Sequence, residues 1–227
     1  MEKKGLGHVE VIASFVLFIA GVGFVLYYFM PLISYNSDNS VNVMDGLIEM
    51  VQSKISVYSV IVNGGNSNVV IAVRINETGN FSVFDDSGIK ESKRIGEIIY
   101  IEGNWNDKKK ISIVFSEDLP DSSSEIKSAK ENSALYKIGA VQKMKVISER
   151  KIKEINTSYY ENYSSIAEKL ELGKMNNFNL IFDINGREIN MQKEIPVGLE
   201  IGSAEKNVLV LMENGKIGYG KIEVQEW

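Results

Sequence analysis

A nearly unbroken run of apolar residues occupies positions 11–33, with no charged residue between Glu10 and Asp38. A hydrocarbon core of about 30 Å needs roughly 20 apolar residues as an α-helix, and this run meets that length. A secretory signal peptide has a shorter apolar core followed by small residues, whereas bulky residues fill positions 27–30 here. The pattern therefore predicts one transmembrane helix that stays on the protein.

The flanks of this apolar run predict its orientation. Lys3 and Lys4 precede it, and positions 34–42 contain no basic residue. Because basic residues favour the cytoplasmic side of a membrane, we expect a cytoplasmic N-terminus and an extracytoplasmic C-terminal region. No second apolar run of this length occurs in the chain. The expected product is a single-pass protein of the cell membrane.

Beyond the apolar run, the pattern changes first to a polar segment and then to strands. Residues 35–42 are rich in Asn, Ser and Asp and indicate a linker. Apolar residues at helical spacing then predict a short helix over 43–56. Alternating apolar residues predict two hairpins and a lone short strand. The hairpins would pair 57–62 with 69–75 and 95–101 with 111–115, and the lone strand would span 81–84.

The second half of the exterior part has clearer turn signals. Residues 140–155 are predicted to be extended, and a capping-box pattern at Ser158 predicts a helix that stops at Gly173. Asn185-Gly186 and Asn214-Gly215 are typical of type I′ turns between hairpin strands. In the last strand the apolar residues change phase, which predicts a bulge near Gly220.

These patterns together predict an α+β fold. A long N-terminal transmembrane helix would precede a β-rich exterior region of antiparallel hairpins, sandwich-like, with one or two short helices. The polar, Ser-rich segment 117–133 indicates a second linker. The expected divisions are 1–34 (leader and transmembrane helix), 35–42 (linker), 43–116 (first β-rich lobe), 117–133 (linker) and 134–227 (second β-rich lobe with one helix).

Composition narrows the chemistry. The chain has 25 Lys and Arg against 30 Asp and Glu, a net charge of −5 that argues against nucleic acid as a partner. It has no cysteine, and His8 is its only histidine, so the exterior part lacks disulfides, thiol nucleophiles, His-based triads and Cys/His metal sites. Carboxylate-only catalysis needs an Asp/Glu pair, and no spacing singles one out. We expect no enzyme, cofactor or metal.

Four Asn-x-Ser/Thr sequons fit an extracytoplasmic location and are candidate glycosylation sites. They begin at Asn76, Asn80, Asn156 and Asn162. In a chain so rich in Asn and Ser, chance is the competing explanation for each of them.

The first thirty residues resemble the class III (prepilin-type) signal of bacterial and archaeal type IV pilin-like proteins. The matching positions are the basic Lys3 and Lys4, then Gly5, Leu6 and Glu10. The resemblance implies that a prepilin-type peptidase cleaves after Gly5 on the cytoplasmic face. Leu6 would then be the mature N-terminus, and Glu10 would be its fifth residue.

The resemblance also implies a role for Glu10 in assembly. In that family the apolar helices bundle into a filament core, and the glutamate is thought to pair with the N-terminal amine of a neighbouring subunit. Such pairing would offset the cost of placing a carboxylate in apolar surroundings. Two departures stand out: Gly7 offers a second cleavage position, and the family helix often continues into the head, where a linker is expected here.

Two functions therefore compete. The first is a pilin-like single-pass membrane protein that displays a β-rich exterior domain as a structural or minor subunit of a surface filament. Its partners would be the membrane, the peptidase and other pilin-like subunits, including copies of itself. The alternative is a membrane-anchored extracytoplasmic binding or adhesion protein that does not assemble. In that case the leader stays on, and Glu10 lies among lipid headgroups near Lys3 and Lys4.

Overall fold

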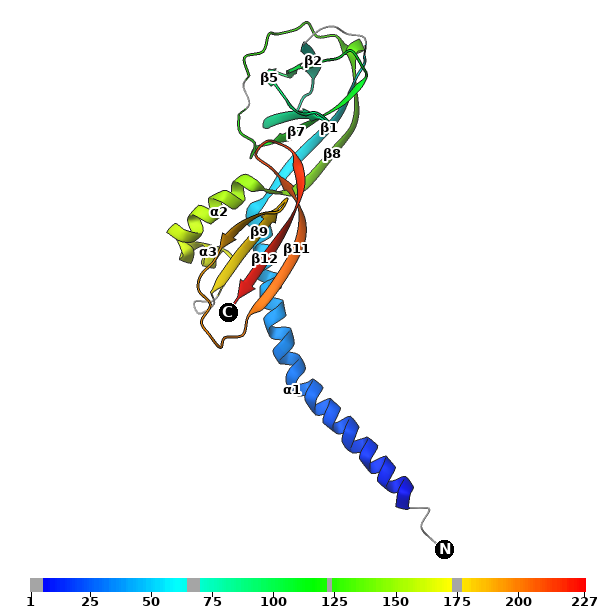
Figure 1. Ribbon diagram of the computed structural model, residues 1–227, viewed down its shortest axis with the longest axis vertical. Helices are drawn as coiled ribbons and strands as arrows, with labels where there is room; N and C mark the ends of the chain where they lie inside the picture. The colour runs from blue at the N-terminus through cyan, green and yellow to red at the C-terminus, as the bar shows by residue number, and fades with distance from the viewer. Residues whose placement is uncertain (1–5, 65–69, 122–123, 173–176) are drawn as a thin grey trace.

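A computed structural model describes the backbone of residues 6–64, 70–121, 124–172 and 177–227. Within the first helix, side chains are described for residues 12–24 and from residue 40 onward. One long helix leads into a head made mainly of strands, with further short helices packed on one side of it (Figure 1). The predicted α+β class is confirmed.

The long helix α1 spans Leu6–Val51, 46 residues, which at 1.5 Å per residue is about 69 Å. It passes without a break through 34–42, so the prediction that this polar segment is non-helical is wrong. The physical reason lies just beyond that segment, where Val43, Met44, Leu47 and Val51 are buried in the head. Tertiary packing of this kind outweighs weak helix propensity.

Two further details of α1 differ from the sequence pattern. A proline normally interrupts a helix, but Pro31 lies inside α1, where it cannot donate a backbone hydrogen bond. The helix is bent along its length (Figure 1). At its far end the helix stops at Val51 and β1 begins at Gln52, several residues before the predicted end of the helix.

Nine strands form one sheet in the order β10-β9-β12-β11-β8-β1-β7-β3-β4. All described pairings in it are antiparallel except the short parallel contact of β11 with β8. The strands span Gln52–Val62 (β1), Asn80–Asp85 (β3), Gly88–Lys90 (β4), Lys109–Ser116 (β7), Tyr136–Ser148 (β8), Phe178–Ile184 (β9), Arg187–Met191 (β10), Gly202–Leu211 (β11) and Ile217–Glu226 (β12).

A second sheet of three strands has the order β2-β6-β5, with β2 at Val70–Arg74, β5 at Ser92–Ile95 and β6 at Ile98–Glu102. Both hairpins predicted in the first half are therefore wrong. β1 and β7 belong to the large sheet, whereas β2 and β6 belong to the small one. Apolar residues of the two sheets share one buried cluster, so the strands of each predicted hairpin lie in opposite layers of a sandwich instead of pairing with each other.

Two main hydrophobic clusters cover different ends of the large sheet. The sandwich cluster lies between the two sheets and includes Val60, Val83, Ile99 and Trp105. The helix cluster joins the end of α1 to the short helices and to the strands from β9 to β12. β1 pairs with both β7 and β8 and so connects the two ends. The expected division into lobes at 43–116 and 134–227 stays a prediction.

The first of the short helices begins earlier than the sequence predicted. β8 ends at Ser148, whose Oγ accepts a hydrogen bond from the backbone N–H of Lys151 and caps α2, Glu149–Glu161. The prediction of an extended run over 140–155 is thus confirmed as far as Ser148 and wrong for 149–155, which are helical. Ser158 lies inside α2 and does not cap a helix. The helix α3, Tyr163–Lys169, follows at the predicted place. A 3-10 turn, η1, spans Ser133–Leu135 at the end of the polar segment 117–133.

Both Asn-Gly hairpins are confirmed. β9 pairs with β10 across Asn185 and Gly186, whose φ values of 51° and 80° fit the predicted type I′ turn, and β11 pairs with β12. At the second turn Gly215 has a φ of 84° but Asn214 has no positive φ, so the type I′ turn predicted there is wrong. The predicted bulge is wrong, because Gly220 stays in register opposite Val208. The phase change in β12 arises because one face of the strand is buried near its beginning and the opposite face is buried farther along. Ile217 packs in a small cluster on one face, and Ile222 packs in the helix cluster.

Candidate functional site

The apolar half of α1 is the first candidate surface. Between residues 12 and 24 the large side chains are exposed, with Leu17 at 73% and Phe18 at 66%. Residues 15–19 are consecutive, so their side chains point to all sides of a helix with 3.6 residues per turn. A helix that is apolar all round is normally buried in a larger assembly or in a membrane. In the described part of the chain, no helix combines the length and the apolar character needed to cross a membrane.

The predicted processing and assembly residues lie at the beginning of this helix. Lys3, Lys4 and Gly5 fall outside the described residues. Leu6 is the first residue of α1, and the backbone of Glu10 lies within it. Residues four positions apart are neighbours on one helix face. A mature chain starting at Leu6 would therefore begin about one helical turn before the backbone position of Glu10.

The four sequons differ in how open their asparagines are. Asn76 and Asn162 are exposed, and Asn162 lies between α2 and α3. Asn80 is partly buried, and its side-chain amide donates a 2.7 Å hydrogen bond to the carbonyl of Leu119. Asn156 is also partly buried, and its side-chain oxygen is enclosed. Asn76 and Asn162 are the two that could accept a glycan without rearrangement.

A groove of about 1000 Å³ crosses the middle of the large sheet where β1 and β8 pair. Lys54 and Lys145 lie directly opposite each other in that pairing, and Lys143 lies opposite Ser56. Alternate strand residues share a face, so these three lysines point to the same side. Neither Lys54 nor Lys145 forms an ion pair with any described residue. The groove therefore holds two lysines without ion-pair partners among the described residues, in a lining that also contains the carboxylates of Glu49, Glu117 and Asp118.

The rim of the groove is neutralised by nearby carboxylates. Lys143 lies 3.4 Å from Glu77, which also accepts a 2.8 Å hydrogen bond from the Tyr58 hydroxyl. That hydrogen bond, opposed by burial and helped by Lys143, lowers the pKa of Glu77. On the opposite rim Lys151 donates to the carbonyl of Gln52 at 2.7 Å and lies 3.5 Å from Asp118. This arrangement can attract an anion.

A buried carboxylate, Glu149, lies at the start of α2, two residues before Lys151 of the groove. It is 5% exposed and contacts the Arg187 guanidinium, the Lys153 ammonium at 3.3 Å and the backbone N–H of Glu213 at 3.1 Å. Burial alone would raise its pKa, but these three partners together hold the pKa below its usual value. All of them come from the surrounding fold, so Glu149 joins α2 to β10 and to the β11–β12 turn.

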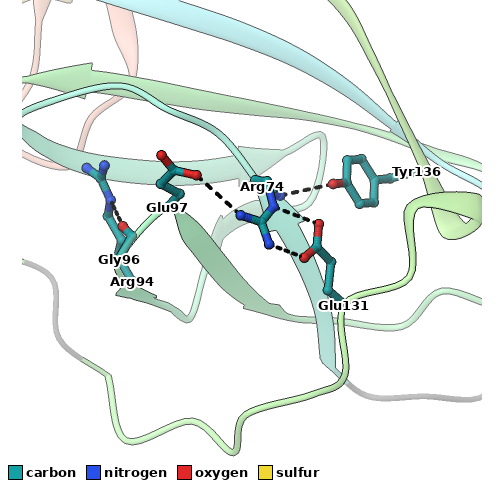
Figure 2. A network of polar contacts seen from close by, with 6 residues as sticks. All are labelled: Arg74, Arg94, Gly96, Glu97, Glu131 and Tyr136. Atoms are coloured by element: carbon teal, nitrogen blue, oxygen red, sulfur yellow. Dashed lines mark hydrogen bonds and ion pairs between the residues drawn. The ribbon is translucent and has the colours of Figure 1, made fainter.

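A second polar network fixes the end of the polar segment 117–133 against the three-stranded sheet (Figure 2). The Arg74 guanidinium forms two hydrogen bonds with Glu131, at 2.6 and 3.1 Å, and one with Glu97 at 3.3 Å. The backbone N–H of Arg74 donates to the Tyr136 hydroxyl at 3.0 Å. The carboxylates, Glu131 first, raise the pKa of Arg74. These contacts explain how a polar segment without regular structure is held on the head.

The basic residues within 143–153 lie on two different elements. Lys143 and Lys145 lie on β8 at the groove, whereas Lys151 and Lys153 lie on α2 and form ion pairs. The alternation of Lys143 and Lys145 was the available signal for a shared face. Across the described residues, no group of His, Cys, Asp and Glu is arranged to hold a metal ion.

Comparisons of the chain with protein-family models, with curated proteins and with solved structures found no match.

Proposed function

We propose that the chain is a pilin-like, single-pass membrane protein and a structural or minor subunit of a surface filament. The observation that carries this proposal is the continuity of α1, which runs from the apolar half straight into the core of the head. A helix of this kind joins the head rigidly to the apolar rod. The expected linker, the main departure from the pilin pattern, is replaced by helix.

The proposed mechanism begins with processing at the cytoplasmic face. Lys3 and Lys4 hold the N-terminus in the cytoplasm by the positive-inside rule. A prepilin-type peptidase cleaves after Gly5, and residues 11–33 span the membrane until assembly. The β-rich head, with its exposed sequons at Asn76 and Asn162, lies on the extracytoplasmic side.

Assembly would then depend on the apolar rod and its single acid. Helices pack side by side through the exposed apolar residues of α1. The Glu10 carboxylate pairs with the Leu6 amine of an adjacent copy, because a buried carboxylate is costly without a partner. This pairing fixes the axial register between neighbouring subunits.

Glu10→Ala tests this mechanism. The variant should be made, processed and inserted, but its incorporation into sheared cell-surface material should fall strongly. The measurement is mass-spectrometric quantification of the subunit in that material, together with electron microscopy. Asp45→Ala is the matched control, since Asp45 is a carboxylate on the same helix that forms an exposed ion pair with Lys206. Normal incorporation of Glu10→Ala would contradict the mechanism.

One observation favours the second candidate, a tethered binding protein that does not assemble. The groove across β1 and β8 presents Lys54 and Lys145 without ion-pair partners among the described residues. Like charges directly opposite in a sheet are destabilising, and a bound anionic group would relieve them. An unprocessed chain that is absent from surface filaments would favour this candidate.

A further inference from the structure

The loop between β10 and β11, residues 192–201, carries an unusual concentration of exposed apolar side chains. Val197 is fully exposed at 104%, Leu199 is 52% exposed and Ile201 is 47% exposed. Scattered apolar residues on a protein surface need no explanation, but three within five residues at one loop tip form a local apolar surface. None of the three belongs to a hydrophobic cluster of the described head.

This loop lies at the end of the head from which α1 leaves toward the N-terminus. Figure 1 shows it as the brown to orange trace beside the C-terminus, below the strands β9 to β12. The C-terminal Trp227 is partly exposed at the same end, where its backbone pairs with Asn177. Tryptophan is enriched where protein meets the lipid–water boundary.

The length of α1 places this end of the head close to the proposed membrane. The apolar run ends at Ile33, and Ser40, where the description of side chains on α1 resumes, is buried. Seven helical residues correspond to about 10 Å. The headgroup layer on each side of a bilayer is about 5–8 Å thick. A loop that extends from the underside of the head therefore needs to cross only a short gap to reach lipid.

The beginning of the loop is held against the head by contacts of Lys193. The backbone N–H of Lys193 donates to the side chain of Asn179 at 2.8 Å, and the Lys193 ammonium lies 3.1 Å from the centre of the Tyr163 ring. The Tyr163 hydroxyl in turn accepts a hydrogen bond from the N–H of Phe178 at 2.8 Å. Contacts with α3 and β9 thus hold the loop in place.

We infer that residues 197–201 insert into the outer headgroup layer of the bilayer and brace the head of the membrane-inserted subunit on the lipid surface. The inference rests on the proposed membrane span. The driving force is burial of Val197, Leu199 and Ile201. Attraction to anionic lipid plays no part, because the loop contains one lysine and two glutamates and has a net charge of −1. Zwitterionic lipid is therefore sufficient.

The absence of native cysteine allows a direct test. Val197→Cys in the full chain is labelled with an environment-sensitive fluorophore and reconstituted into phosphatidylcholine vesicles that contain nitroxide-labelled lipid. Ala20→Cys, inside the proposed span, reports on the span itself. Ile95→Cys is the matched control, because Ile95 is an apolar residue with 55% exposure on β5, at the far end of the head.

We expect lipid nitroxide to quench Val197→Cys several-fold more than Ile95→Cys, and to quench Ala20→Cys as well. The inference would be overturned if Ala20→Cys is quenched but Val197→Cys is quenched no more than Ile95→Cys. That result would leave the proposed span intact. Absence of quenching at Ala20→Cys would contradict the span. A Val197→Cys signal that changes with protein density, but not with lipid nitroxide, would assign the loop to a contact between copies and also overturn the inference.

Discussion

At the scale of single residues, Glu149 shows how one buried charge holds three elements together. Its side chain is 7% exposed, and its partners come from α2, from β10 and from the turn after β11. Because the pKa of Glu149 is lowered in the folded state, the carboxylate contributes stability that is fully present above its ordinary value of 4.5. That contribution is lost as the pH falls through the lower, folded-state value.

Glu149→Gln should lower the free energy of unfolding at pH 7 by about 2 kcal/mol, the scale of a hydrogen bond to a charged group. The difference from the native chain should shrink as the pH falls below 4.5, where the unfolded carboxyl is protonated. Urea unfolding of the full chain in detergent, followed by circular dichroism at several pH values, measures both effects.

Glu154→Gln is the control for this experiment. Glu154 pairs with Arg150 at 3.1 Å, but both side chains are more than half exposed. A surface pair four residues apart on a helix contributes about 0.3–0.5 kcal/mol. Equal effects of the two substitutions, or a Glu149→Gln effect that does not depend on pH, would contradict the role given to Glu149.

At the scale of elements, the docking of α1 on the head is the feature that sequence patterns missed. Val43, Leu47 and Val51 recur at spacings of four residues and indicate a helix, and this part was predicted. The polar segment before them gives no helical signal of its own. It becomes helical because both of its ends are fixed, one by the apolar run and the other by burial in the helix cluster. No local pattern contains that information.

Leu47→Ala tests whether the head depends on this docking. Leu47 is fully buried in the helix cluster, so its truncation should cost about 2–5 kcal/mol. Ile48→Ala is the control, because its partly exposed side chain packs only at the edge of that cluster. Chemical unfolding of the full chain should show a much lower midpoint for Leu47→Ala than for Ile48→Ala. Similar midpoints for the two variants would mean that α1 is only loosely attached.

Strand pairing shows the same limit of prediction from sequence. The two Asn-Gly hairpins were predictable, because a short turn determines which strands pair. The longer connection after β1 does not determine a partner, and β1 pairs instead with β7 and with the distant β8. An apolar strand face indicates that the strand is buried, but it does not indicate which sheet buries it. The helix α2 was missed over its first half because β-branched Ile152 and Ile155 favoured an extended prediction.

At the scale of the whole molecule, the chain is an apolar rod joined to a layered head by one uninterrupted helix (Figure 1). The rod presents its described large side chains to the surroundings, and the head presents a lysine-lined groove and two open sequons. The candidate processing residues were named from sequence by resemblance. The groove was not, because it forms only where β1 and β8, far apart in the chain, come side by side.

The central claim is that cleavage after Gly5 produces a new N-terminal amine at Leu6, with which the Glu10 carboxylate of a neighbouring copy pairs. Intact-mass measurement of the protein from native membranes tests this most directly. The account predicts a mature chain that lacks Met1 to Gly5 and begins at Leu6. A chain that still begins at Met1 would leave Glu10 without its partner and would contradict the account.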